Sequence, residues 1–168
     1  MGCIVALKDS GSIYLASDSL ITAKYGSIEA NEPKFSMVNG DDKLVWFGYT
    51  GNPRFFQIAK NVPMDYEIEH LKSGVIKWTI ALRTSVPIDF KYECMVVGNS
   101  SIFTFDQDGF VIEHTGSHFA IGSGAQYALG ALDAMTDDAS PLSIVKIVLD
   151  IVIDRDITSG GSVHTQIV

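Results

Sequence analysis

The sequence is poor in cysteine and in basic residues. Its 168 residues include two cysteines, Cys3 and Cys94, and no Cys-x-x-Cys pair, which excludes a disulfide framework and a cysteine-based metal site. Twelve Lys and Arg stand against twenty Asp and Glu, a net charge of −8, and the basic residues are scattered along the chain. Because a phosphate backbone repels such a chain, we expect no nucleic-acid partner.

Long apolar runs and targeting signals are also missing. No stretch reaches the about 18 apolar residues that a membrane-spanning helix needs, and residues 1–8 do not form a basic leader with an apolar core. The four histidines are dispersed and have no cysteine nearby. We therefore expect a reduced, cytoplasmic protein without a membrane partner, metal or cofactor.

What is present is the composition of an ordinary globular domain. Hydrophobic residues make up 46% of the chain and charged residues 19%, values that argue against disorder. The length is that of about one domain, and no repeat or linker interrupts it. We predict a single domain over residues 1–168.

The pattern of short apolar stretches and turn residues predicts antiparallel hairpins. The first pairs residues 4–7 with 13–16 across a turn that contains Gly11. Strands are also expected at residues 43–49, after a turn at 39–42, and at residues 92–97, 101–105, 110–114 and 163–168.

Apolar residues recurring every three to four positions predict four helices. Ser123 precedes the third as a candidate N-cap, and Ser140-Pro141 opens the fourth. The predicted helices cover residues 54–60, 65–83, 124–135 and 140–155. Blocks of strands alternating with blocks of helices indicate an α+β fold in segregated layers.

Three segments carry motifs that composition does not explain. They are Ala16-Ser17-Asp18-Ser19 followed by Asn31-Glu32-Pro33-Lys34, the run Gly122-Ser123-Gly124 within residues 119–129, and Asp156-Ile157-Thr158-Ser159-Gly160-Gly161. In this order and spacing they resemble the proteasome β-subunit family, including bacterial and phage proteasome-like peptidases, over nearly the whole chain. These are N-terminal nucleophile hydrolases.

The resemblance implies a fold, a substrate and partners. The implied fold is a four-layer αββα sandwich of two antiparallel sheets. The implied substrate is a peptide or an unfolded protein. The implied partners are further copies of the chain, in a ring or helical homo-oligomer, and an ATP-dependent unfoldase.

The resemblance also implies roles for individual residues. In the family the first residue of the mature chain, usually Thr, attacks an amide, and its α-amino group takes the hydroxyl proton. The catalytic aspartate and lysine map onto Asp18 and Lys34. The oxyanion-binding glycine maps onto Gly51, the serine that assists proton transfer onto Ser123, and the pair that orients the nucleophile onto Asp156 and Ser159.

Each of these residues has a structural alternative. Asp18 and Lys34 could form an ordinary surface salt bridge, and Gly51 could simply turn the chain. Ser123 could cap a helix, and the segment 156–161 could mark the end of one.

The sequence departs from the family at the nucleophile, because this position falls on Gly2. Glycine has no group that can attack, even if Met1 is removed, so the resemblance predicts an inactive peptidase scaffold with a cavity where a threonine side chain would sit. Cys3 is an alternative nucleophile for an amidase, although strand parity turns it to the opposite face. A third hypothesis is a non-catalytic structural subunit. Whether Gly2 is natural or an inactivating substitution stays open.

Overall fold

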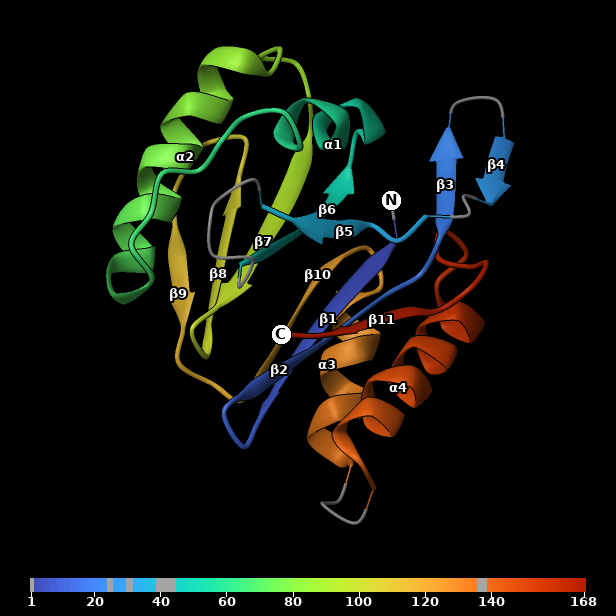
Figure 1. The fold of residues 1–168 in the computed structure, drawn as a ribbon. Helices are drawn as coiled ribbons and strands as arrows, with labels where there is room; N and C mark the ends of the chain where they lie inside the picture. The colour runs from blue at the N-terminus through green and yellow to red at the C-terminus, as the bar shows by residue number, and fades with distance from the viewer. Residues whose placement is uncertain (1, 24–25, 30–31, 39–44, 136–138) are drawn as a thin grey trace.

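Two antiparallel β-sheets lie face to face between helices in the computed structural model (Figure 1). The structure describes residues 2–23, 26–29, 32–38, 45–135 and 139–168. The turn predicted at residues 39–42, and the first residues of the strand predicted at 43–49, lie outside these ranges.

The first sheet has the strand order β10-β1-β2-β11. The turn between β1 and β2 contains Ser10 and Gly11, both with positive φ, as the right-handed twist of a tight hairpin requires. Gly122, the last residue of β10, pairs with Cys3 at the start of β1. The strands are β1 (Cys3–Asp9), β2 (Ser12–Ser17), β10 (His118–Gly122) and β11 (His164–Ile167).

The second sheet has the order β5-β6-β7-β8-β9. A separate two-stranded ribbon pairs β3 (Leu20–Ala23) with β4 (Gly26–Glu29). The strands of the second sheet are β5 (Phe35–Met37), β6 (Trp46–Gly51), β7 (Tyr92–Gly98), β8 (Ser101–Asp106) and β9 (Ile112–His114).

Helices cover the outer face of each sheet (Figure 1). The second sheet carries α1 (Pro53–Ala59) and α2 (Leu71–Ser85), the latter preceded by a 3₁₀ turn (Ile68–His70). The first carries α3 (Ala125–Ala134) and α4 (Pro141–Arg155), whose N-cap is the predicted Ser140. Separate apolar clusters fill the three spaces between the four layers. The predicted αββα sandwich of two antiparallel sheets is therefore confirmed.

Two parts of the secondary-structure prediction were wrong or incomplete. The helix predicted over residues 65–83 begins only at Leu71, after the 3₁₀ turn. Asp65 and Tyr66 instead pack against Gly74 of α2, and any side chain on Gly74 would collide with them. Strands β3, β4, β5 and β10 were not predicted, because they are short or lie inside a segment read only as a motif.

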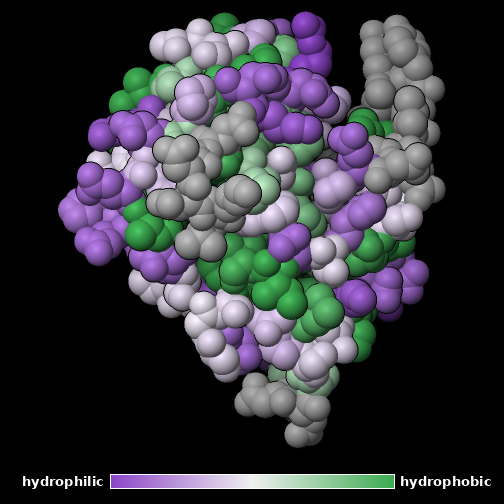
Figure 2. All heavy atoms as spheres, viewed as in Figure 1, coloured by the Kyte–Doolittle hydropathy of each residue, from purple (hydrophilic) through white to green (hydrophobic). Residues whose placement is uncertain are grey.

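Hydrophobic and hydrophilic side chains share the surface seen in Figure 2. Apolar side chains gather near the middle of this view, and Ile167 of the edge strand β11 is half exposed. In the described part of the chain, no helix combines the length and the apolar character needed to cross a membrane.

Candidate active site

Asp18 and Lys34 form a buried ion pair at the end of the first hairpin. Lys34 Nζ lies 2.7 Å from Asp18 Oδ1, and the two side chains are 5% and 0% exposed. The alternative of a surface salt bridge is therefore wrong for this pair. Lys34 is held from both sides, because its N–H donates to Ser17 Oγ and its carbonyl accepts from the Tyr49 N–H.

The Asp18 carboxylate also organises the backbone around it. Oδ1 accepts from the Cys3 N–H at 2.8 Å, and Oδ2 accepts from the Gly160 N–H at 3.0 Å. One carboxylate therefore ties together the start of β1, the lysine and the loop after α4. Removal of this charge would leave Lys34 as an uncompensated buried cation.

Burial lowers the pKa of Lys34 from its usual value, although the Asp18 carboxylate opposes this shift. A desolvated amine loses its proton more readily than one in water. The positive charge of the pair nonetheless stands beside residue 2, where it favours a negative charge on any attacking group.

Gly2 lies against this ion pair. A Cβ added to Gly2 would meet Lys34 Nζ first and then the Asp18 carboxylate. The expected cavity is therefore not there, because the lysine amine occupies the place of a residue-2 side chain. Gly2 also has a φ of +134°, a conformation that L-residues rarely adopt.

Ser123 connects Gly2 to the third motif. The Gly2 N–H donates to Ser123 Oγ at 3.3 Å, and Ser123 Oγ donates to Asp156 Oδ2 at 2.7 Å. Ser123 is not the N-cap of α3, because that position belongs to Gly124, without a side-chain cap. This alternative was wrong, since the hydroxyl is directed to Asp156 instead.

Asp156 is the centre of a hydroxyl cluster. Its Oδ2 accepts from Ser123 and Ser159, both at 2.7 Å, and its carboxylate accepts from the Thr158 N–H and hydroxyl. Burial alone would raise the pKa of Asp156, but the hydrogen bonds from Ser123, Ser159 and Thr158 outweigh it and lower the pKa. Asp156 is at the same time the C-cap of α4, so the helix-end alternative holds alongside the cluster.

Gly51 ends β6 opposite Ser123. Its φ is +105°, and a Cβ there would collide with the backbone of Lys91 and Tyr92, so only glycine fits. A hollow of about 350 Å³ opens between Gly51 and Ser123. On its other side, Gly51 lies with Lys34 and Tyr49 along a smaller hollow.

Cys3 faces away from this centre. Its side chain belongs to the apolar cluster under α3 and α4, where it lies against Gly124, as strand parity predicts. Burial raises the pKa of the Cys3 thiol to about 12, and the nearby Asp18 carboxylate adds to this shift. A thiolate is the nucleophilic form, so this environment opposes attack by Cys3.

Sequence reasoning missed three participants. Thr158 is bonded to Ser123 at 2.6 Å as well as to Asp156, and it stood unnoticed inside the third motif. The Gly160 N–H, which donates to Asp18 Oδ2, lies in a segment for which the sequence predicted only the third motif or a helix end. Glu93, which accepts from the Gly122 N–H at 2.8 Å, gave no signal, because a single Glu in a strand has no distinctive spacing.

The described residues contain no group of three or more His, Cys, Asp or Glu that could hold a metal ion. The polar groups at the site are instead satisfied by one another. The site brings together the Gly2 nitrogen, the Lys34 cation and the Ser123 hydroxyl. Such groups are needed for proton transfer and for stabilisation of an oxyanion.

The chain is similar to known proteins in part of its sequence and in its fold. Residues 93–168 match the proteasome subunit family. No curated protein matches the chain. This match confirms the predicted resemblance over the segment that holds the second and third motifs, and the solved structures below show that the fold is shared.

Three solved structures illustrate the shared fold. Eukaryotic HslV from Trypanosoma brucei superposes with a TM-score of 0.77 at 19% identity, over 98% of each chain. BPH from Thiobacillus denitrificans, in complex with epoxomicin, gives 0.78 at 18% identity, over 99% of this chain and 97% of that one. Anbu (ancestral beta-subunit) from Yersinia bercovieri gives 0.78 at 17% identity, over 98% and 80%.

Proposed function

Because this chain is similar to the proteasome subunit family in sequence and has the fold of proteasome-like proteins, we propose that it is a peptidase-type subunit whose nucleophile position is Gly2. Residues 1–168 act as one domain built around the hydrolysis of peptide bonds. The chain as given is inactive, because Gly2 offers neither a hydroxyl nor a thiol.

One observation carries this proposal. The nitrogen of Gly2 lies against Ser123 Oγ, beside the buried Lys34–Asp18 pair. Once Met1 is removed, this nitrogen is an α-amine with a pKa near neutrality, which makes it a suitable general base. The general base and the cation of the site thus both lie beside residue 2, where a side chain would have to displace the flexible end of Lys34.

The remaining residues have assigned roles in this proposal. With threonine at position 2, the α-amine takes the hydroxyl proton as the oxygen attacks the peptide carbonyl. The Lys34 cation favours the developing alkoxide, and the Gly51 N–H stabilises the oxyanion. Ser123, hydrogen-bonded to the Asp156 carboxylate that Ser159 also holds, relays the proton between the amine and the leaving nitrogen. Water then hydrolyses the ester that remains on the threonine and restores its hydroxyl.

Restoration of the nucleophile tests the proposal. Gly2→Thr is expected to hydrolyse short fluorogenic peptides, and Lys34→Ala in the same background is expected to abolish that activity. If Gly2→Thr loses Met1, folds and still cleaves no peptide, the site is not a hydrolase centre.

A non-catalytic structural subunit is the second candidate. The observation in its favour is that the Lys34 amine fills the space of a residue-2 side chain, so the site is closed as it stands. This candidate predicts that Gly2→Thr destabilises the fold without creating activity. The amidase that uses Cys3 is disfavoured by the burial of that thiol between the first sheet and its helices.

Assembly is part of the proposal. Large apolar side chains are exposed on the outer helices, among them Ile80 of α2, Tyr127 of α3 and Ile147 of α4, and burial of such surface drives association. The similarity to HslV and Anbu supports a ring or helical homo-oligomer and an ATP-driven unfoldase as partner. A sharp monomer in light scattering at micromolar concentration contradicts the assembly.

A further inference from the structure

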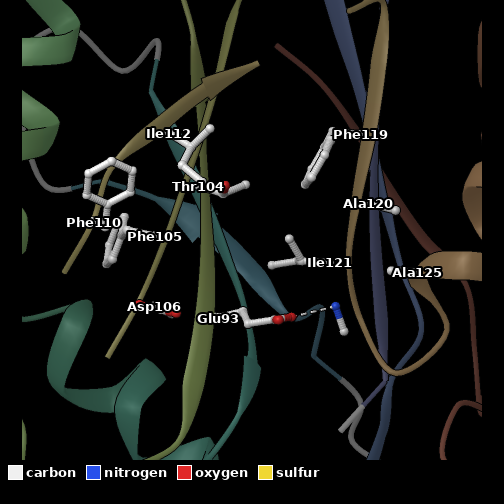
Figure 3. Close-up of a pocket in the computed structure, with 11 residues that line it drawn as sticks. Glu93, Thr104, Phe105, Asp106, Phe110, Ile112, Phe119, Ala120, Ile121 and Ala125 are labelled. Atoms are coloured by element: carbon white, nitrogen blue, oxygen red, sulfur yellow. Dashed lines mark hydrogen bonds between the residues drawn. The ribbon is translucent and has the colours of Figure 1, made fainter. Parts of the chain in front are cut away.

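A hollow of about 300 Å³ lies beside the candidate site, between the edges of the two sheets (Figure 3). It is called the Glu93 hollow below. Glu93 of β7 reaches across it to the first sheet, where its carboxylate accepts from the Gly122 N–H at 2.8 Å (Figure 3). The same oxygen accepts from Thr50 Oγ1 at 3.4 Å.

The lining of the Glu93 hollow is apolar and acidic. Phe110, Ile112 and Phe119 contribute apolar walls, and Glu93 and Asp106 contribute carboxylates (Figure 3). None of the described residues that line it is basic. Phe110 is 76% exposed, which leaves a large apolar face uncovered at the rim.

This combination suits the side chain of lysine or arginine. Such a side chain lays its aliphatic stem along apolar surface while its cationic head stays near water and carboxylates. A guanidinium can also stack on an aromatic ring such as Phe110 and bind a carboxylate with two hydrogen bonds. A volume of about 300 Å³ is at the lower limit for ligand pockets, which favours one side chain over a larger molecule.

The Glu93 hollow adjoins the candidate site, with which it shares two lining residues. Glu93 and Gly122 also line the hollow between Gly51 and Ser123. The Gly2 nitrogen, which is the general base of the proposed reaction, lies beside Ser123. It returns the hydroxyl proton to the leaving nitrogen of the substrate, so this nitrogen must lie toward Ser123. The part of the substrate that follows the cleaved bond, its leaving side, therefore runs toward the Glu93 hollow.

The edge of the first sheet offers main-chain partners along the same path. In the described part of the chain, β10 has a neighbouring strand only on the side of β1. The Gly122 N–H points away from β1, toward Glu93, so the N–H and C=O of Ala120 point the same way. An extended peptide can pair with this edge, which a free small cation cannot.

We propose that the Glu93 hollow binds a lysine or arginine side chain on the leaving side of a peptide substrate, with Glu93 as the residue that sets this specificity. The assignment of the leaving side rests on the proposed function. The binding itself needs no nucleophile, so it can be measured on the chain as given.

The test is fluorescence anisotropy with a labelled, extended octapeptide that carries arginine, norleucine or glutamate at one position. The arginine peptide is expected to bind about tenfold more tightly than the norleucine peptide, since a hydrogen bond to a charged group contributes this much. The glutamate peptide is expected to bind most weakly. The preference for arginine should shrink as salt is added.

Matched variants separate a specific contact from net charge. Glu93→Gln removes the charge but keeps an acceptor for the Gly122 N–H, and it is expected to abolish the preference for arginine. Asp106→Asn, which can still accept from the Asp108 N–H, is expected to reduce it. Asp150→Asn changes the net charge equally on the exposed face of α4 and is expected to leave the preference intact.

The inference is overturned if no peptide binds, if arginine and norleucine bind equally, or if Glu93→Gln and Asp150→Asn have the same effect. The experiments distinguish failure of this inference from failure of the proposed function. If Gly2→Thr cleaves peptides with no preference for a basic leaving side, the hydrolase stands and this inference fails. If basic peptides bind in a Glu93-dependent way but Gly2→Thr is inactive, the binding site stands and the hydrolase proposal fails.

Discussion

The amine of Lys34 lies where the first side-chain carbon of residue 2 would be. This contact shows that, with glycine at position 2, the end of the Lys34 side chain fills the space of a residue-2 side chain. Any side chain at position 2 must move the flexible end of Lys34 and weaken its ion pair with Asp18.

The first prediction follows from this contact. Gly2→Ala is expected to lower the free energy of unfolding by about 1–3 kcal/mol, the usual effect of inserting a group into a filled site. Chemical denaturation with urea measures it. The matched control is Gly130→Ala in α3, where a Cβ meets no neighbour, and this change is expected to stabilise the protein by about 0.5–1 kcal/mol. Equal effects at the two positions contradict the packing described at Gly2.

The second prediction concerns the buried ion pair. Asp18→Asn is expected to destabilise the fold by about 3–5 kcal/mol, because it leaves Lys34 as a buried cation without its counter-charge. Adding Lys34→Met should recover part of this loss, so the double variant is more stable than the sum of the single effects predicts. Additive losses in urea unfolding would show that the two charges do not depend on each other.

The third prediction concerns thiol reactivity. Burial raises the pKa of Cys3 to about 12 and that of Cys94 well above its usual value, so both thiols stay protonated at neutral pH. Iodoacetamide is expected to label neither residue in the native protein and both after unfolding. Rapid native-state labelling of Cys3, mapped by peptide mass spectrometry, would instead support Cys3 as a nucleophile.

The fourth prediction gives the pH dependence of the hydroxyl cluster. Because the pKa of Asp156 is lowered in the folded protein, its contribution to stability is full above the ordinary carboxyl pKa, about 3.9, and is lost as the pH falls through the folded value. Asp156→Asn is therefore expected to cost roughly 1–3 kcal/mol at pH 7, and progressively less in acid. Unfolding curves recorded from pH 7 down to about pH 2, which passes below the ordinary carboxyl pKa, measure the difference.

The control for this experiment is Asp154→Asn, which removes an exposed carboxylate two residues earlier in α4. It should have little effect on stability at any pH. A constant difference between the wild-type protein and Asp156→Asn across this range would mean that the carboxylate charge contributes nothing to the cluster.

The layers of the fold could be predicted from the sequence because they follow from local patterns. The hairpin of β1 and β2 has alternating apolar residues and a glycine turn, and α4 has a proline start and a regular apolar face. The edge strand β10 could not be predicted in this way. Its position depends on pairing with β1, more than 100 residues earlier.

The candidate site was predictable to the extent that it consists of motifs. The residues of the three motifs meet because β1, β2 and β10 are neighbours in one sheet and the loop after α4 returns to Asp18. The occupation of the residue-2 position by Lys34 depends on the conformation of a long side chain, which no spacing reveals. The same holds for Glu93, whose partner lies in the opposite sheet.

The most direct test of the account is the intact mass of the protein after incubation with a covalent inhibitor of N-terminal nucleophiles. Residue 2 is the nucleophile position in this account, so the chain as given is expected to gain no mass, apart from any loss of Met1. Gly2→Thr, freed of Met1, is expected to gain one inhibitor at residue 2, and Lys34→Ala in that background should not. An adduct on the unaltered chain, or one on Gly2→Thr that maps to another residue, would contradict the account.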